Sequence, residues 1–74
     1  MEEFIYNFAK IFDDIEVSSI TPHTMFRELE DWDSIAGLSL IAMADEEYDV
    51  TLNAEDMRKC QTVEDLYKTI VNKK

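Results

Sequence analysis

The sequence is poor in the residues that make cross-links, metal sites and tight turns. Its 74 residues include one Cys, one His, one Gly and one Pro. A lone cysteine excludes an internal disulfide framework, and one Cys with one His cannot form a zinc site. β-Hairpin turns depend on Gly, so its scarcity favours helices over strands. We therefore expect no catalytic residues, no metal ligands, and a reducing, cytoplasmic setting.

Basic residues are also scarce. Seven Lys and Arg stand against seventeen Asp and Glu, which gives a net charge of −10 at pH 7. This charge repels phosphate backbones and anionic lipid surfaces, so we exclude nucleic acid as a partner. No apolar run approaches the roughly 18–20 residues that cross a bilayer, and the acidic residues 2–3 do not resemble a signal peptide. The sequence predicts a soluble, unprocessed monomer with no membrane insertion.

What the sequence does contain is helical periodicity. With 46% hydrophobic residues, a chain of this length is expected to form one small domain over residues 1–74. Apolar residues recur at three- and four-residue spacing, typical of one helix face. The predicted fold class is all-α, a small four-helix bundle of three main helices plus one short helix, with a long loop between helices one and two. The predicted helices span residues 2–16, 34–47 and 54–59, and a last helix follows residue 62.

Polar side chains mark where these helices begin. Asp33 and Asn53 are favourable N-caps for the second helix and the short helix. Thr62 and Asp65 form the capping signature of the last helix. The expected core-facing residues are Phe4, Ile5, Phe8, Ile11, Phe12 and Ile15 in the first helix, Ile35, Leu38, Ile41, Ala42 and Tyr48 in the second, Val63, Leu66, Tyr67, Ile70 and Val71 in the last, and Met25, Phe26 and Leu29 in one turn of the long loop.

Charge is distributed unevenly along the chain. Between residues 28 and 56 every charged side chain is acidic, which points to a partner with a basic surface. Within this segment Ser34 falls on the first turn of the second helix, where a phosphate group would meet the positive helix end. Ser34 is therefore the best modification site in the chain. The ten acids are Glu28, Glu30, Asp31, Asp33, Asp45, Glu46, Glu47, Asp49, Glu55 and Asp56.

Part of this acidic segment has the spacing of a calcium-binding loop. Asp45, Glu47 and Asp49 take the first, third and fifth positions, and Asp56 takes the twelfth. Val50 occupies the sixth position, where the sharp turn of an EF-hand requires Gly. The sequence thus does not predict an EF-hand, although weak binding of divalent ions stays compatible with it.

Three blocks of sequence, in order, resemble a known family. Asp33, Ser34 and Ile35 are similar to an Asp-Ser-Leu signature. Residues 45–52, DEEYDVTL, resemble an acidic, aromatic and then alternating hydrophobic stretch, and residues 59–66, KCQTVEDL, resemble the start of a final helix. Together these blocks resemble acyl carrier proteins, the phosphopantetheine-bearing helical bundles of fatty-acid and polyketide pathways.

The resemblance implies a function and a set of site residues. It implies that a separate phosphopantetheinyl transferase attaches 4′-phosphopantetheine, donated by coenzyme A, to Ser34. The arm would carry acyl or aminoacyl groups as thioesters to loading and transferring enzymes that have basic docking patches. The residues expected to contact these partners are Asp33, Ile35, Leu38, Ser39, Asp45 and Glu46.

Two features separate this sequence from the usual fatty-acid carriers. Ala36 and Ser39 occupy positions near which those carriers place acids, and Trp32 and Gly37 are also unusual there. These differences favour a specialised member of the family. The alternative, which needs no resemblance, is a small acidic module that binds proteins or divalent ions without a covalent cofactor.

Overall fold

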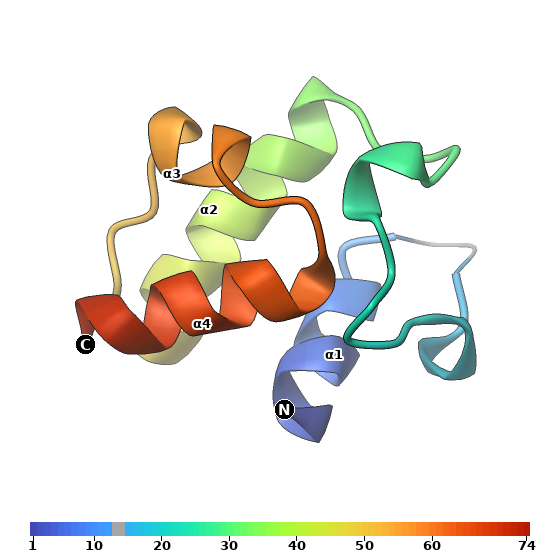
Figure 1. The fold of residues 1–74 in the computed structure, drawn as a ribbon, viewed down its shortest axis with the longest axis horizontal. Helices are drawn as coiled ribbons and strands as arrows, with labels where there is room; N and C mark the ends of the chain where they lie inside the picture. The colour runs from blue at the N-terminus through green and yellow to red at the C-terminus, as the bar shows by residue number, and fades with distance from the viewer. Residues whose placement is uncertain (13–14) are drawn as a thin grey trace.

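The computed structural model describes residues 1–12 and 15–74, and these residues form α-helices and short 3₁₀ turns (Figure 1). Within these residues the only β-type pairing is an isolated bridge between Met25 and Thr62. The predicted all-α fold with three main helices and one short helix is confirmed. The elements are α1 (Glu2–Ala9), η1 (Val17–Ser19), η2 (Phe26–Glu28), α2 (Ser34–Tyr48), α3 (Ala54–Arg58) and α4 (Val63–Lys73).

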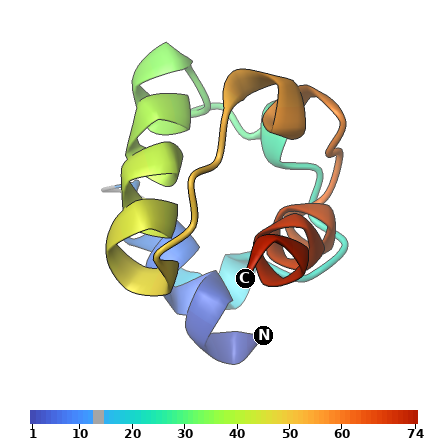
Figure 2. The same ribbon diagram turned by 90° about the vertical axis from the view of Figure 1, so that its left-hand side faces the viewer.

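The helices surround one hydrophobic core. Figure 2 shows α2 and α4 on opposite sides of the molecule, with α1 at one end and the short α3 at the other. The long segment between α1 and α2 passes along the side opposite the 49–53 loop and returns to the start of α2 (Figure 1). None of the described helices has the length and apolarity needed to cross a bilayer. The largest fully buried side chains are Phe4, Phe8, Phe26, Leu40, Leu52, Leu66, Ile70 and Val63.

Helix α1 is shorter than its periodicity predicts. It ends at Ala9, residues 10–11 form a turn, and residues 15–16 are not helical. Residues 13–14, also within the predicted helix, lie outside the described residues. Three of the residues from 13 to 16 are acidic, and negative charge disfavours the C-terminal end of a helix. Phe12 is nevertheless buried and Ile15 packs against the core. These two expected core residues therefore contact the core although they lie beyond the end of α1.

Helix α2 buries a different face from the predicted one. Its buried residues are Ala36, Leu40, Met43 and Ala44, whereas Ile35 and Leu38 are 72% and 66% exposed. The predicted burial of Ile35, Leu38 and Ala42 is therefore wrong, and Ile41 and Tyr48 are only half-buried. Apolar residues lie on every side of this helix, so spacing alone fits two faces equally well. The small side chains of Ala36 and Ala44 permit close packing of the buried face against the core.

The C-terminal end of α2 is set by a backbone turn. Asp49 adopts the left-handed conformation, with φ 56° and ψ 42°. The backbone N–H of Val50 donates to Ala44 O at 3.2 Å, and Val50 is buried beneath the turn. Asp49 N also donates to Asp45 O at 3.1 Å, which is the bond of the αL motif, in which a residue that tolerates positive φ ends the helix. Helix α2 begins at Ser34 as predicted and continues one residue beyond the predicted end at residue 47.

The N-terminus of α4 satisfies its backbone donors with both local and distant partners. Asp65 N donates to Thr62 Oγ1 at 3.1 Å, which confirms the predicted capping signature. Val63 N and Glu64 N donate to the carbonyl oxygens of Thr24 and Pro22, at 3.0 and 2.9 Å. These are donors that a helix cannot satisfy internally, so the long loop fixes α4 in place. In the predicted buried face, Val63, Leu66 and Ile70 are buried and Tyr67 is half-buried, but Val71 is 46% exposed, so its predicted burial is wrong.

The capping carboxylate of α4 should make stability depend on pH. Backbone N–H groups of Gln61 and Thr62 donate to Asp65 and hold the pKa of its carboxyl below the ordinary value of 3.8. A lowered folded-state pKa stabilises the protein above the unfolded-state value, and this stabilisation is lost as the pH falls through the folded-state pKa. At pH 7 we expect Asp65→Ala to lower the melting temperature by about 2–4 °C, or about 0.5 kcal/mol in a domain of this size.

Melting curves from pH 7 to pH 2 check this prediction. The gap between wild type and Asp65→Ala should close as the pH falls below about 4. Glu64→Ala is the control, because Glu64 forms only an exposed pair with Lys68 at 4.0 Å. A gap of constant size across the whole range would show that the carboxylate charge contributes nothing.

The long loop packs through one aromatic turn. The predicted turn is confirmed at η2, where Phe26 is fully buried and Leu29 packs against the core. Met25 is 40% exposed, so its predicted burial is wrong, although its backbone pairs with Thr62. Arg27 Nη2 donates to the carbonyl oxygen of Met57, which connects η2 to α3. This connection holds the long loop against α3.

Candidate functional site

Ser34 stands at the first position of α2 and is exposed. Asp33 precedes it in extended conformation, and its side-chain Oδ1 accepts from Ala36 N at 2.8 Å. Gly37 N donates to the backbone oxygen of Asp33 at 3.0 Å. The predicted N-cap is thus confirmed, and it starts the helix at the residue after Asp33. Ser34 is presented to solvent at the positive end of a helix of 15 residues.

The predicted site residues fall on two adjacent stripes along α2. Residues separated by three or four positions share a helix face, so Leu38 and Asp45 lie on the stripe that begins at Ser34. Ile35, Ser39 and Glu46 lie on the neighbouring stripe. Asp45 stands eleven residues beyond Ser34, about 16 Å along the helix axis. The structure therefore spreads these residues over the length of α2 and does not gather them around the hydroxyl.

An open groove of about 650 Å³ lies beside Ser34, between η2, the start of α2 and α3. Gly37 forms part of its wall, and a Cβ there would stand 3.5 Å from Met57 Cε and 3.9 Å from Trp32 Cζ2. The volume is within the range of small-molecule sites. The groove is lined by Phe26, Arg27, Trp32, Asp33, Ser34, Gly37, Leu38, Ile41, Ala54, Met57 and Arg58.

Aromatic packing holds the wall of this groove in place. The rings of Trp32 and Phe26 meet edge to face, with centroids 4.9 Å apart, and Phe8 stacks on Trp32 at 6.4 Å. Trp32 is half-buried, so one side of its indole packs on the core while the rest lines the groove. The groove thus rests on the aromatic core, but most of its lining was not predicted. Met57 and Arg58 lie more than twenty positions after Ser34 and Arg27 lies seven positions before it, and no motif connects them.

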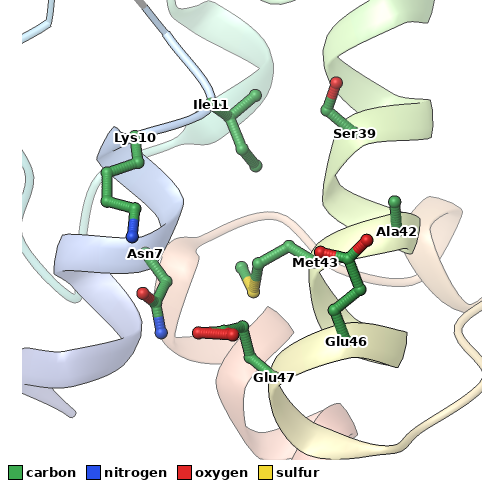
Figure 3. A pocket seen from close by; sticks show the side chains of 8 residues that line it. All are labelled: Asn7, Lys10, Ile11, Ser39, Ala42, Met43, Glu46 and Glu47. Atoms are coloured by element: carbon green, nitrogen blue, oxygen red, sulfur yellow. The ribbon is translucent and has the colours of Figure 1, made fainter.

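A second, smaller hollow of about 300 Å³ lies between α1 and α2 (Figure 3). It brings together Ser39 and Glu46, two of the predicted partner-contacting residues. Figure 3 shows the Asn7 amide from α1 and the Glu47 carboxylate from α2 turned into the space between these helices. Asn7 is 6% exposed, and its Nδ2 has no hydrogen-bond partner. This hollow is separate from Ser34.

Tyr48 lies near the Asn7 side chain. Burial raises the pKa of the Tyr48 hydroxyl, and the nearby Asn7 amide opposes the rise. The two groups nevertheless do not meet the geometry of a hydrogen bond. Asn7 is therefore a buried donor near an aromatic hydroxyl, in a region that sequence periodicity marked only as core.

The acids predicted to attract a basic partner are exposed to solvent. Asp33, Asp45 and Glu46 are exposed, as are all the other acids from residue 28 to residue 55. Asp56 differs, because it accepts from Lys73 and its pKa is lowered by that partner. Across residues 1–12 and 15–74 no three His, Cys, Asp or Glu side chains are grouped to hold a metal ion. The calcium-type spacing is not realised as a loop, since residues 45–48 belong to α2.

Comparison with known protein families identifies the chain. A family model described as "Phosphopantetheine attachment site" matches residues 8–70, which is most of the chain. The chain belongs to this family. No curated protein and no solved structure gives a significant match. Members of the family are carrier proteins with covalently attached 4′-phosphopantetheine and are not themselves catalysts. This finding confirms the predicted family and decides against the alternative of a module without a covalent cofactor.

Proposed function

We propose that Ser34 carries the 4′-phosphopantetheine arm and that the protein moves acyl or aminoacyl groups between enzymes as thioesters. The observation that carries this proposal is the exposed Ser34 hydroxyl at the start of α2, beside an open groove and inside the matched segment. The site also fits the group physically. A phosphate on Ser34 would lie at a helix N-terminus, where backbone N–H groups and the helix dipole favour negative charge.

The attachment step requires a separate enzyme. Ser34 Oγ forms a bond to phosphorus while a P–O bond of the coenzyme A pyrophosphate breaks, and adenosine 3′,5′-bisphosphate leaves. The described part of the chain groups no three metal ligands, and the carboxylate beside Ser34, that of Asp33, is engaged as the helix cap, so we infer that the phosphopantetheinyl transferase supplies the metal and the base. The chain itself contributes the nucleophilic oxygen and its rigid placement by the Asp33 cap.

We also propose that the groove beside Ser34 shelters the load from water. The arm supplies a thiol that holds the load as a thioester, and water is the reagent that would hydrolyse this bond. Trp32, Ile41 and Met57 give the groove apolar lining within reach of the attachment point. Burying apolar surface there gains roughly 25 cal/mol per Å². A hydrophobic load is therefore expected to spend part of its time in the groove.

We propose that partner enzymes recognise the exposed side of α2. Ile35 and Leu38 are exposed although they are large and apolar, which is typical of a contact surface. Asp33, Asp45 and Glu46 flank them with negative charge, which accelerates the encounter with a basic patch. Ser39 lies on the same stripe as Ile35 and is half-buried and neutral. We propose that this neutral position favours enzymes of a specialised pathway over those of fatty-acid synthesis.

Truncating Ile35 tests the contact surface. We expect Ile35→Ala to lower kcat/KM of a partner transferase about 30-fold, corresponding to about 2 kcal/mol for a central apolar contact. The melting temperature should change little, because Ile35 is exposed and Ala is the best helix former. Val71→Ala on α4 is the matched control, since Val71 is also exposed but lies on another helix. Equal losses in the two variants would show that α2 is not the docking face.

The proposed attachment is tested by intact-mass measurement. The purified chain is incubated with coenzyme A and a broad-specificity phosphopantetheinyl transferase, and the product is digested and sequenced by mass spectrometry. We expect one arm per chain, located on Ser34. An unmodified chain, or an arm on Ser18, Ser19 or Ser39, would overturn the proposal.

A further inference from the structure

Both arginines of the chain line the groove beside Ser34. Arg27 and Arg58 are the two arginines among the seven basic residues of a sequence whose net charge is −10. Arg27 comes from η2 and Arg58 from the end of α3, thirty-one positions later, and the fold brings them to one groove. The groove is therefore a basic site in an acidic protein.

The charges around these two arginines leave them available to a ligand. Asp33 is the single carboxylate of the groove lining, and its side chain is already engaged with Ala36 N. Over the described ranges, 1–12 and 15–74, neither guanidinium forms an ion pair. Arg27 donates to Met57 O and lies over the Phe26 ring, 5.3 Å from its centroid. A guanidinium has five N–H donors, so both residues retain donors for an anion.

The remaining lining of the groove is mostly apolar. Trp32, Ile41 and Met57 offer surface for a hydrocarbon stem, and the arginines offer planar donors that match a carboxylate. We propose that the groove selects a load with an apolar stem and a free terminal carboxylate, that is, a dicarboxylic acid held as a half-thioester. This inference rests on the proposed attachment of the arm at Ser34. It adds the chemical class of the load, which the family alone does not define.

Two loads of six carbons each, one with and one without a terminal carboxylate, distinguish the effect of the carboxylate from that of the apolar stem. The apo chain is converted with a permissive phosphopantetheinyl transferase into holo, hexanoyl and adipoyl forms, using coenzyme A, hexanoyl-coenzyme A and adipoyl-coenzyme A. In each reaction the Ser34 oxygen–phosphorus bond forms and adenosine 3′,5′-bisphosphate leaves. Intact mass confirms each form before melting temperatures are measured at low salt. Fluorescence of Trp32, the single tryptophan, reports whether the groove is occupied.

We expect the adipoyl form to melt at least about 4 °C above the hexanoyl form. A small domain shows a shift of this size for a modest gain in its free energy of unfolding. Arg58→Gln should remove most of this difference, and Arg58→Lys should restore part of it. Lys59→Gln is the matched control, because Lys59 has the same charge and is the next residue but does not line the groove. Raising the salt concentration should narrow the difference in wild type.

Three results would overturn the inference. The first is an equal melting temperature of the adipoyl and hexanoyl forms at low salt, and the second is a Lys59→Gln variant that removes the difference as fully as Arg58→Gln does. The third is a change in melting temperature on Arg58→Gln that is as large in the holo form as in the adipoyl form. This result would identify the arm's phosphate as the anion that Arg58 binds. A chain that is not loaded at Ser34 would instead overturn the proposed function, and mass measurement detects that case separately.

Discussion

Replacing Ser34 by Ala is expected to abolish attachment of the arm and to leave the fold unchanged. The hydroxyl oxygen is the atom that bonds to phosphorus, so no residual modification should survive its removal. The helix start does not depend on it, because Asp33 supplies the capping oxygen to Ala36 N. An exposed residue at this position should alter the free energy of unfolding by less than about 0.5 kcal/mol. Intact mass and circular dichroism measure the two outcomes on one sample.

The matched control for this variant is Ser19→Ala. Ser19 is also an exposed serine, but it lies in η1, outside α2 and outside the groove lining. It should be loaded to the same extent as wild type. A full arm on Ser34→Ala, or an unfolded Ser34→Ala chain, would contradict the assignment. Loss of loading in both variants would mean that the loss is not specific to the Ser34 hydroxyl.

Replacing Phe26 by Ala should cause the largest loss of stability among single changes near the site. Phe26 is 0% exposed, its ring meets Trp32 at 4.9 Å, and the Arg27 guanidinium covers it. Removing a buried phenyl group costs about 3–5 kcal/mol. A domain of this size has roughly 4–11 kcal/mol in total, so a large share of its stability is lost. Urea unfolding followed by Trp32 fluorescence gives the value directly.

The same substitution should also affect the groove. Phe26 and Trp32 form one of its walls, so their rearrangement should slow the loading of Ser34 even where the chain stays folded. Met25→Ala is the control, since Met25 is the preceding residue but is 40% exposed. A loss of less than about 1 kcal/mol in Phe26→Ala would show that η2 does not support the core.

The helix starts were predictable because their signals are local. Asp33, Asn53 and Thr62 each accept a hydrogen bond from a backbone N–H three residues on. Such contacts need no information about the rest of the chain. The end of α1 was less predictable, since its apolar residues continue to Ile15 and contact the core without being helical.

The exposed face of α2 was not predictable from periodicity. Ile35 and Leu38 have the spacing of a buried stripe, and so do Ala36, Leu40 and Met43. The choice depends on which side chains fit into the shared core, and this is a property of packing. The resemblance to carrier proteins had placed Ile35 and Leu38 among the partner contacts, and their exposure is compatible with that expectation.

By itself, the sequence determined the helical fold class, the three capped helix starts, the family and the candidate Ser34, because periodicity, caps and motifs act over a few neighbouring residues. Tertiary structure alone decided which face of α2 meets water and which residues surround Ser34. Arg27 reaches Met57, and Thr24 reaches Val63, across long stretches of chain. Contacts of this kind form only when the whole core has assembled, so no local pattern encodes the groove between η2 and α3 or its two arginines.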